Sequence, residues 1–99
     1  MALLAADDTA TALATARRWA HASPDVGAQL DRLEQTLPAE VSALAEEREA
    51  QFAGETRFAS AFVRQQWELR AANGRLRCLF TWRRGSGGWR LNQWLCARP

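Results

Sequence analysis

The sequence predicts an α+β fold, in which about three N-terminal helices pack on a C-terminal three-stranded antiparallel β-meander. One observation is the spacing of apolar residues, which is helical up to about residue 60 and alternates one by one from residue 63 onward. The other is size and composition, because 99 residues with 47% hydrophobic and 24% charged residues are typical of one globular domain. We therefore expect a single domain, residues 1–99, mainly helical over 1–60 and forming a sheet over 61–99.

Charge is divided unevenly between the two halves of the chain. Residues 1–53 contain four arginines and nine acidic residues, a net charge of −5, whereas residues 54–99 contain nine arginines and two glutamates, a net charge of +7. Opposite charges attract at short range, so we expect the acidic helical half to pack beside the basic sheet half.

Cap residues mark the starts of the first two helices. Asp7 and Asp8 precede an Ala-rich segment, 9–22, of high helix propensity. Ser23 then repeats the start signal as an N-cap, with Pro24 at the first helical position.

The second and third helices follow from apolar spacing. We expect the second helix to end at Pro38 and a third to run from Ala39 to about residue 60, weakened by ~1 kcal/mol at Gly54. The second helix carries a single apolar stripe formed by Val26, Leu30, Leu33 and Leu37.

Residues 63–71 alternate between apolar and polar side chains, which is typical of a half-buried strand. A helix extending to Ala72 is the rival prediction, and it would suit a ferredoxin-like arrangement with strands drawn from residues 40–53. The composition of residues 46–51 favours helix over strand for that stretch.

Two hairpins connect the expected strands. Asn73-Gly74 predicts a two-residue turn that places Trp67 opposite Phe80. For the last hairpin, a four-residue loop aligns Trp82 with Leu91. A five-residue loop instead sets Cys78 opposite Cys96, close enough for a disulfide, and turns Trp94 inward against Phe80. Both registers remain open, and a disulfide would imply an oxidising compartment.

In the four-residue register, the outer face of the sheet gathers arginines on neighbouring strands. Like charges directly opposite one another destabilise a sheet, so we expect solvent or helix acids such as Glu46, Glu47 and Glu49 to compensate. Trp and Arg are the residues most enriched at binding hot spots. The predicted binding residues are Arg64, Arg70, Arg77, Leu79, Arg83, Arg90 and Trp94.

No residue cluster matches a catalytic, metal or nucleotide motif. His21 lies near an expected helix end, where an imidazole usually interacts with the last carbonyls. Residues 83–88 are basic and glycine-rich but lack the Lys-Ser/Thr ending of a phosphate loop. One histidine and two cysteines give no familiar zinc spacing. We expect no enzymatic activity, no cofactor and no metal.

The C-terminal strands, ending in Gly88-Trp89-Arg90-Leu91, resemble the end of an NTF2-like (cystatin-like) domain. That superfamily usually has additional strands that form a conical pocket. This chain has no tyrosine and one histidine, so no pocket set of catalytic residues is carried over. The resemblance implies a non-catalytic, frequently dimeric member whose sheet serves as an interface, as in envelope and secretion assemblies.

The sequence thus predicts a protein-interaction module that uses the outer sheet face to bind a second copy or an acidic protein partner. Nucleic-acid binding through the same face and a small-ligand pocket of NTF2-like type are the alternatives. No apolar run approaches the ~18 residues that span a bilayer, and no secretion signal is visible. We expect a cytoplasmic location, or an envelope location if a signal or anchor has been removed.

Overall fold

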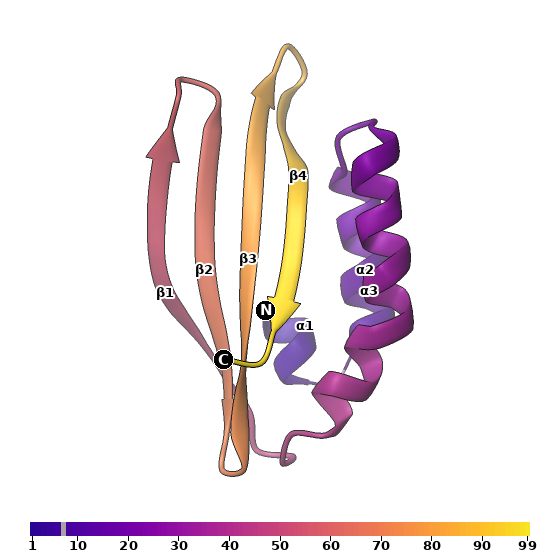
Figure 1. The fold of residues 1–99 in the computed structure, drawn as a ribbon, viewed down its shortest axis with the longest axis vertical. Coiled ribbons are helices and arrows are strands. Elements are labelled where there is room, and N and C mark those ends of the chain that lie inside the picture. The colour runs from indigo at the N-terminus through magenta and orange to yellow at the C-terminus, as the bar shows by residue number, and fades with distance from the viewer. Residues whose placement is uncertain (7) are drawn as a thin grey trace.

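The computed structural model describes residues 1–6 and 8–99 as three helices followed by one four-stranded antiparallel sheet (Figure 1). The fold is therefore α+β, but the prediction of three strands is wrong, because a fourth strand precedes them. Strand order in the sheet follows chain order. The elements are α1 (Ala2–Ala5), α2 (Thr9–Trp19), α3 (Pro24–Ser42), β1 (Glu49–Phe58), β2 (Phe62–Ala71), β3 (Gly74–Gly85) and β4 (Gly88–Ala97).

The predicted helix starts are confirmed by their cap hydrogen bonds. The Asp8 carboxylate accepts from the Thr11 backbone N–H at 3.2 Å, so it caps α2. The Ser23 hydroxyl accepts from the Asp25 N–H at 3.3 Å, with Pro24 in the first turn of α3. The cap predicted at Asp7 lies outside the described residues.

The prediction that this helix ends at Pro38 is wrong, because α3 continues through Pro38 to Ser42. An internal proline costs a helix about 3 kcal/mol, because it removes a hydrogen bond and crowds the preceding turn. Continuing the helix buries Val41 to 0% exposure, and Leu44 just beyond it to 7%. Full burial of such a side chain contributes about 1.5–3 kcal/mol. Two additional buried side chains therefore offset the proline.

Residues 49–58 form strand β1, so the helix predicted over 39–60 is wrong beyond α3. This strand pairs with β2 along its whole length, with a β-bulge between Phe52 and Gly54. The Phe52 ring packs edge-on against Trp67 of β2, with ring centroids 5.3 Å apart. Pairing with β2 outweighs the local preference for helix, because the Phe52–Trp67 contact and the hydrogen bonds to the backbone of β2 form only when these residues are a strand.

The strand predicted over 63–71 is confirmed as β2. The pairing of β2 with β3, predicted from a turn at Asn73-Gly74, is shifted by two residues. Its turn is formed by Ala72 and Asn73, and Trp67 lies opposite Cys78 rather than Phe80. The Asn73 amide holds this turn, because it accepts from the Ala45 N–H at 2.7 Å and donates to the Ala43 carbonyl at 2.9 Å. A two-residue shift leaves every side chain on its predicted face of the sheet.

The last hairpin contains both of the registers that the sequence left open. Next to the turn, Trp82 lies opposite Leu91, as the four-residue loop predicts. A β-bulge follows, and beyond it Phe80 lies opposite Trp94 and Cys78 opposite Cys96, as the five-residue loop predicts. The two cysteines form a disulfide, with their Cα atoms 4.2 Å apart.

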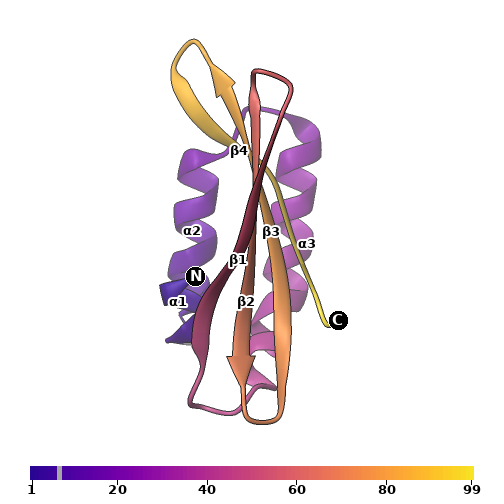
Figure 2. The same cartoon turned by 90° about the vertical axis from the view of Figure 1, so that its left-hand side faces the viewer.

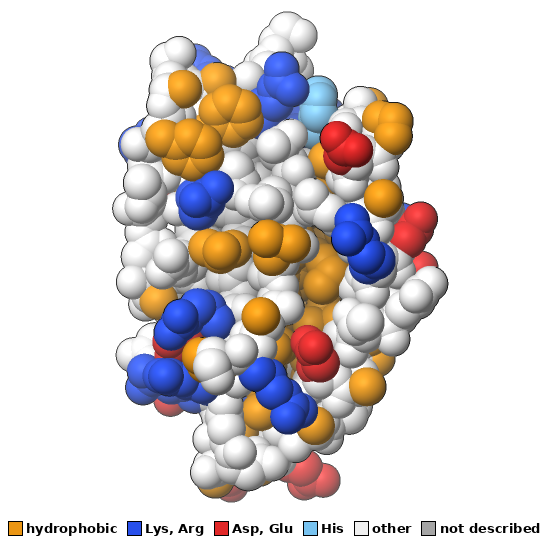
Figure 3. Space-filling view, in the orientation of Figure 1, with side chains coloured by type: hydrophobic (Ala, Val, Ile, Leu, Met, Phe, Trp, Pro, Cys, Tyr) orange, Lys and Arg blue, Asp and Glu red, His pale blue; other side chains and the backbone are white. Residues whose placement is uncertain are grey.

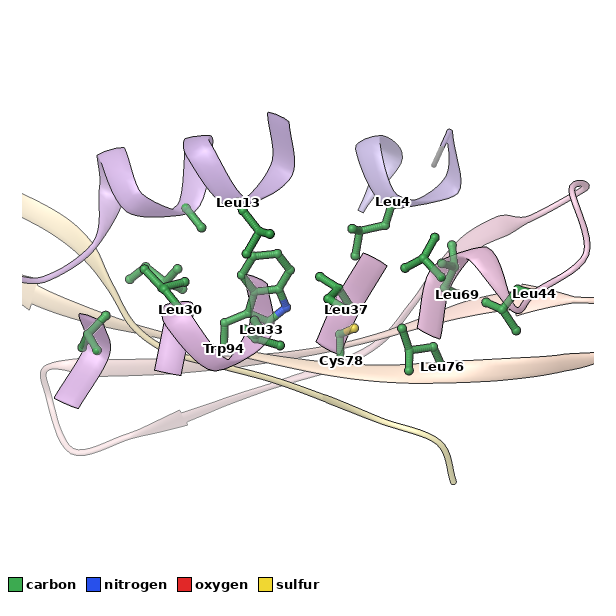
Figure 4. Close-up of a cluster of buried hydrophobic side chains, with 14 residues drawn as sticks. Leu4, Leu13, Leu30, Leu33, Leu37, Leu44, Leu69, Leu76, Cys78 and Trp94 are labelled. Atoms are coloured by element: carbon green, nitrogen blue, oxygen red, sulfur yellow. The ribbon is translucent and has the colours of Figure 1, made fainter. Parts of the chain in front are cut away.

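The core lies between the three helices and the inner face of the sheet, which carries Leu69, Leu76, Cys78 and Trp94 (Figure 4). All four stripe residues of α3 predicted from the sequence are buried. Helix α3 runs beside β4, where the Gln29 side-chain oxygen accepts from the Trp94 backbone N–H at 3.2 Å. Helices α2 and α3 flank the sheet at its β4 side (Figure 2).

Replacing Leu37 with alanine should lower the free energy of unfolding by about 2–5 kcal/mol, because a fully buried leucine leaves a cavity. Leu37 is 0% exposed. The matched control is Leu95→Ala on the open face, 44% exposed in the wild type, which should change stability by less than about 0.5 kcal/mol. Urea denaturation followed by tryptophan fluorescence measures both. Equal losses would contradict this placement of the core.

Reducing the Cys78–Cys96 disulfide should lower the free energy of unfolding by about 3 kcal/mol, the chain-entropy value for a closed loop of this length. The two cysteines are 18 residues apart. Thermal melts with and without dithiothreitol measure the effect, and a Cys78→Ala, Cys96→Ala variant should not respond to the reductant. A wild-type melting temperature that reductant leaves unchanged would contradict the bond.

Candidate functional site

The outer face of the sheet, opposite the core, is turned to the viewer in Figure 1. The helices lie beyond β4, so no helix of the described residues covers β1 to β3 on this face (Figures 1 and 2). In the space-filling view, hydrophobic side chains gather in separate groups on this face, with basic side chains between and below them (Figure 3). A sheet face left open in this way is a candidate interaction surface.

One buried carboxylate organises the lower part of this face. Glu68 of β2 is 7% exposed and lies directly opposite Arg77 of β3. Its Oε2 accepts from Arg70 Nε at 2.9 Å, while its Oε1 is 3.5 Å from a terminal nitrogen of Arg77 and 3.8 Å from one of Arg75. We call Glu68 and these three arginines the Glu68 cluster. It carries three positive charges against one negative charge.

The Glu68 cluster explains how neighbouring arginines are tolerated. Arg70 and Arg75 lie directly opposite each other, which by itself would be repulsive. The hydrogen bond from Arg70 lowers the pKa of Glu68, and this effect is larger than the opposing effect of burial. The charges of Arg70 and Arg75 and the hydrogen bond from Arg77 lower the pKa further, so the carboxylate stays charged. Glu68 of the sheet is therefore the acid that these arginines contact. Of the acids that the sequence suggested, Glu49 lies in β1 directly opposite Arg70.

Apolar side chains lie beside this cluster on the same face. Leu79 of β3 is paired with Leu95 of β4, which is 44% exposed. Further along, Phe58 and Phe62 stack with ring centroids 5.3 Å apart, and the Arg64 guanidinium lies over the Phe58 ring at 5.1 Å. The outer face thus alternates apolar pairs with guanidinium groups.

A polar groove of about 460 Å³ lies where the outer face meets the start of α3. Its floor includes Thr81, 3% exposed, whose hydroxyl donates to the Gln93 side-chain oxygen at 3.0 Å and receives Arg64 Nε at 3.4 Å. On the rim of the groove, a terminal nitrogen of Arg83 lies 3.3 Å from His21 Nε2. The groove is therefore continuous with the outer face, and hydrogen bonds join Arg64, Thr81 and Gln93 within it.

The structure brings together five of the seven predicted binding residues. Arg64, Arg70, Arg77, Leu79 and Arg83 lie on the outer face. Arg90 is opposite Arg83 but turns toward α2, with its guanidinium 5.8 Å from the Trp19 ring centroid.

The prediction for Trp94 is wrong. It is 3% exposed, stacks on Phe80 at 5.2 Å and belongs to the core. The bulge in β4 reverses its side, and Leu95 takes the exposed position instead.

The binding residues predicted from the sequence leave out five residues of this face. They are Phe58, Phe62, Glu68, Arg75 and Leu95. Phe58 was missed because it falls in the predicted helix over 39–60, and Leu95 because the bulge in β4 turns it outward. The signal for Glu68 was present, since it is the only acid among the residues of β2 and β3.

Three further aromatic side chains are exposed away from the outer face. Phe52 of β1 and Trp89 of β4 lie on the inner side of the sheet and are 50% and 40% exposed, and Trp19, the last residue of α2, is 48% exposed. An apolar cavity of about 170 Å³ opens between α1, α2 and the sheet, and Trp82 lines it. This volume is below the about 300–1,000 Å³ of ordinary ligand pockets.

The described part of the chain contains no group of three or more side chains suited to hold a metal ion. Among the helices that the structure describes, none is both long and apolar enough to cross a membrane. No protein family, curated protein or solved structure was found to match this chain.

The Glu68→Gln variant should lose stability at neutral pH but much less in acid. The pKa of Glu68 is lower in the folded protein than in the unfolded chain. Its carboxylate therefore stabilises the fold above the unfolded-state pKa, and this stabilisation is lost as the pH falls through the folded-state pKa. The difference in free energy of unfolding between wild type and variant should therefore grow as the pH rises. Urea denaturation over a pH series measures it, and a difference independent of pH would contradict the charged cluster.

Proposed function

We propose that this protein is a non-catalytic interaction module whose outer sheet face binds an acidic segment of a protein partner. The observation that carries the proposal is the Glu68 cluster. Arg70, Arg75 and Arg77 are held on one carboxylate, yet their side chains remain 53%, 49% and 48% exposed. Each guanidinium has five N–H donors, so donors remain for a partner's carboxylates.

The neighbouring leucines define the chemistry of the partner further. Leu79 and Leu95 give the face an apolar centre beside its basic cluster. Binding hot spots usually combine such a desolvated centre with charged residues around it. The best-fitting partner is therefore a segment with acidic residues flanking one or two apolar side chains.

Charge argues against self-association through this same face. A two-fold interface places the same patch of both copies together, so two net-positive Glu68 clusters would face each other. The acidic helices of a second copy are a weaker match, because Arg17 already bridges Asp31 and Glu34 at 2.9 and 3.0 Å.

Nucleic-acid binding is the second candidate, favoured by the aromatic pair on the basic face. Phe58, however, already has Phe62 stacked on it and Arg64 over its ring, so it offers little surface to a base. A small-ligand site is less favoured because the inner cavity is small. An NTF2-like relationship remains compatible with an interaction role. The disulfide favours an oxidising compartment such as the cell envelope over the cytoplasm.

The Arg70→Glu, Arg77→Glu variant should bind a synthetic peptide of Glu-Glu-Leu repeats at least about tenfold more weakly than wild type, a loss of about 1.4 kcal/mol. Wild-type binding should also weaken at high salt, because the contacts are charged and partly exposed. Fluorescence anisotropy with a labelled peptide measures both effects.

The matched control is Arg18→Glu, Arg32→Glu, which reverses two exposed charges on α2 and α3 away from the sheet face. It should keep most of the affinity. An equal loss in the control would mean that net charge alone attracts the peptide. Tighter binding to a single-stranded oligonucleotide, lost in the Arg70, Arg77 variant, would replace the proposal with nucleic-acid binding.

A further inference from the structure

The two edges of the sheet differ. The outer edge of β4 is closed, because the Leu91 carbonyl accepts from the His21 N–H at 2.8 Å and the Trp94 N–H donates to Gln29. Strand β1 pairs with β2 on one side, and no strand of the described residues pairs with its other side. Figure 2 shows β1 nearest the viewer, with no element in front of it. An edge of this kind is a template for another strand.

The exposed end of β1 reads Gly54, Glu55, Thr56, Arg57 and Phe58. Beyond the bulge, Glu55 and Arg57 lie on the inner face, opposite Gln65 and Val63. Gly54, Thr56 and Phe58 lie on the outer face, opposite Gln66, Arg64 and Phe62. Four of the five residues are exposed, and Gly54 is half-buried.

We propose that two copies of this chain pair through this edge, antiparallel and centred on Thr56, to form a continuous eight-stranded sheet. A two-fold axis at Thr56 places Glu55 opposite Arg57 of the second copy, and Arg57 opposite its Glu55. Directly opposite side chains in a sheet have Cβ atoms about 5 Å apart, so both ion pairs form. The contact is isologous, as a symmetric dimer requires.

The outer-face residues fit the same axis. Thr56 meets its own copy, and Thr–Thr pairs across strands are favourable. Phe58 lies opposite Gly54 of the second copy. A Cβ built at Gly54 has nothing within 4 Å, so the space above this glycine is open to an aromatic ring. The Phe58 ring is 37% exposed and would cover it.

Other registers are disfavoured by the same residues. Shifting the pairing by two positions places Glu55 opposite Glu55 or Arg57 opposite Arg57, which is repulsive. Shifting it by one position sets inner-face residues of one copy against outer-face residues of the other. The bulge at Ala53 prevents the ladder from extending regularly toward Glu49.

Glu55 is already positioned for this contact. Its Oε1 accepts from Gln65 Nε2 at 3.2 Å, and its Oε2 lies 3.6 Å from Arg57 Nε. The Arg57 side chain is 73% exposed, and dimerisation would exchange this ion pair within each chain for two ion pairs across the axis. Because the paired segment is short, we expect a small interface and a dimer that dissociates at low protein concentration.

This inference does not depend on what binds the outer face. Pairing edge to edge about an axis perpendicular to the sheet would, however, place both Glu68 clusters on one continuous face. A dimer would then bind an acidic partner with two copies of the site.

The test is sedimentation equilibrium over a concentration series of wild type and charge variants. Wild type should show a monomer–dimer equilibrium. Glu55→Arg and Arg57→Glu should each dimerise at least about tenfold more weakly, because each places like charges opposite one another twice. An equimolar mixture of the two variants should recover the dimer, since every opposing pair is then an Arg with a Glu. Arg32→Glu, an exposed position on α3 away from the β1 edge, is the charge-matched control and should not change the equilibrium.

Circular dichroism of each variant checks that the monomer remains folded. A wild type that stays monomeric at the highest soluble concentration would overturn the inference. So would a dimer that both single variants preserve, or two weakened variants whose mixture does not recover. These outcomes are separate from the peptide-binding test, which changes Arg70 and Arg77 only.

Discussion

The bulge in the β3–β4 hairpin is the constraint on which the rest of the molecule depends. One additional residue in β4 changes the register between Trp82 and Thr81, and everything beyond it is turned to the other face. Cys78 and Cys96 become direct neighbours and form a disulfide. Trp94 enters the core, where its indole N–H lies 3.1 Å from the Cys96 sulfur. Packing of α2 and α3 against the sheet then surrounds this tryptophan.

The same bulge decides what the outer face offers a partner. With Trp94 turned inward, Leu95 is exposed beside Leu79, so the apolar part of the face is aliphatic. The basic part depends on Glu68, whose buried carboxylate lets three arginines stay close together. A face of aliphatic pairs and half-exposed guanidinium groups suits an acidic protein segment better than a stack of bases.

The two edges of the sheet differ, because the β4 edge is covered and the β1 edge is not paired with another strand of the described residues. Helix α3 and the segment before it close the β4 edge, where they satisfy backbone groups of Leu91 and Trp94. At the other edge, β1 carries the alternating Glu55 and Arg57 that make it complementary to itself. Charge placed on an edge strand usually prevents indiscriminate pairing. In the proposed dimer, the same charges would select one register and one kind of neighbour, a second copy.

The sequence by itself determined the features that depend on residues close to one another in the chain. The caps at Asp8 and Ser23, the buried stripe of α3 and the alternation of β2 are all of this kind. The four arginines and one leucine that were placed correctly on the outer face followed from alternation of this kind.

Tertiary structure decided the rest, because the deciding contacts are distant in sequence. Strand β1 has a helix-favouring start and a bulge that interrupts its alternation, and only pairing with β2 makes it a strand. The helix continues through Pro38 because Val41 and Leu44 gain burial in the core. The Asn73 turn is set by the backbone of residues 43 and 45. Trp94 faces inward because Cys78 pairs with Cys96 in this register. No local pattern distinguishes this register from the other one, since both place apolar residues on the inner face.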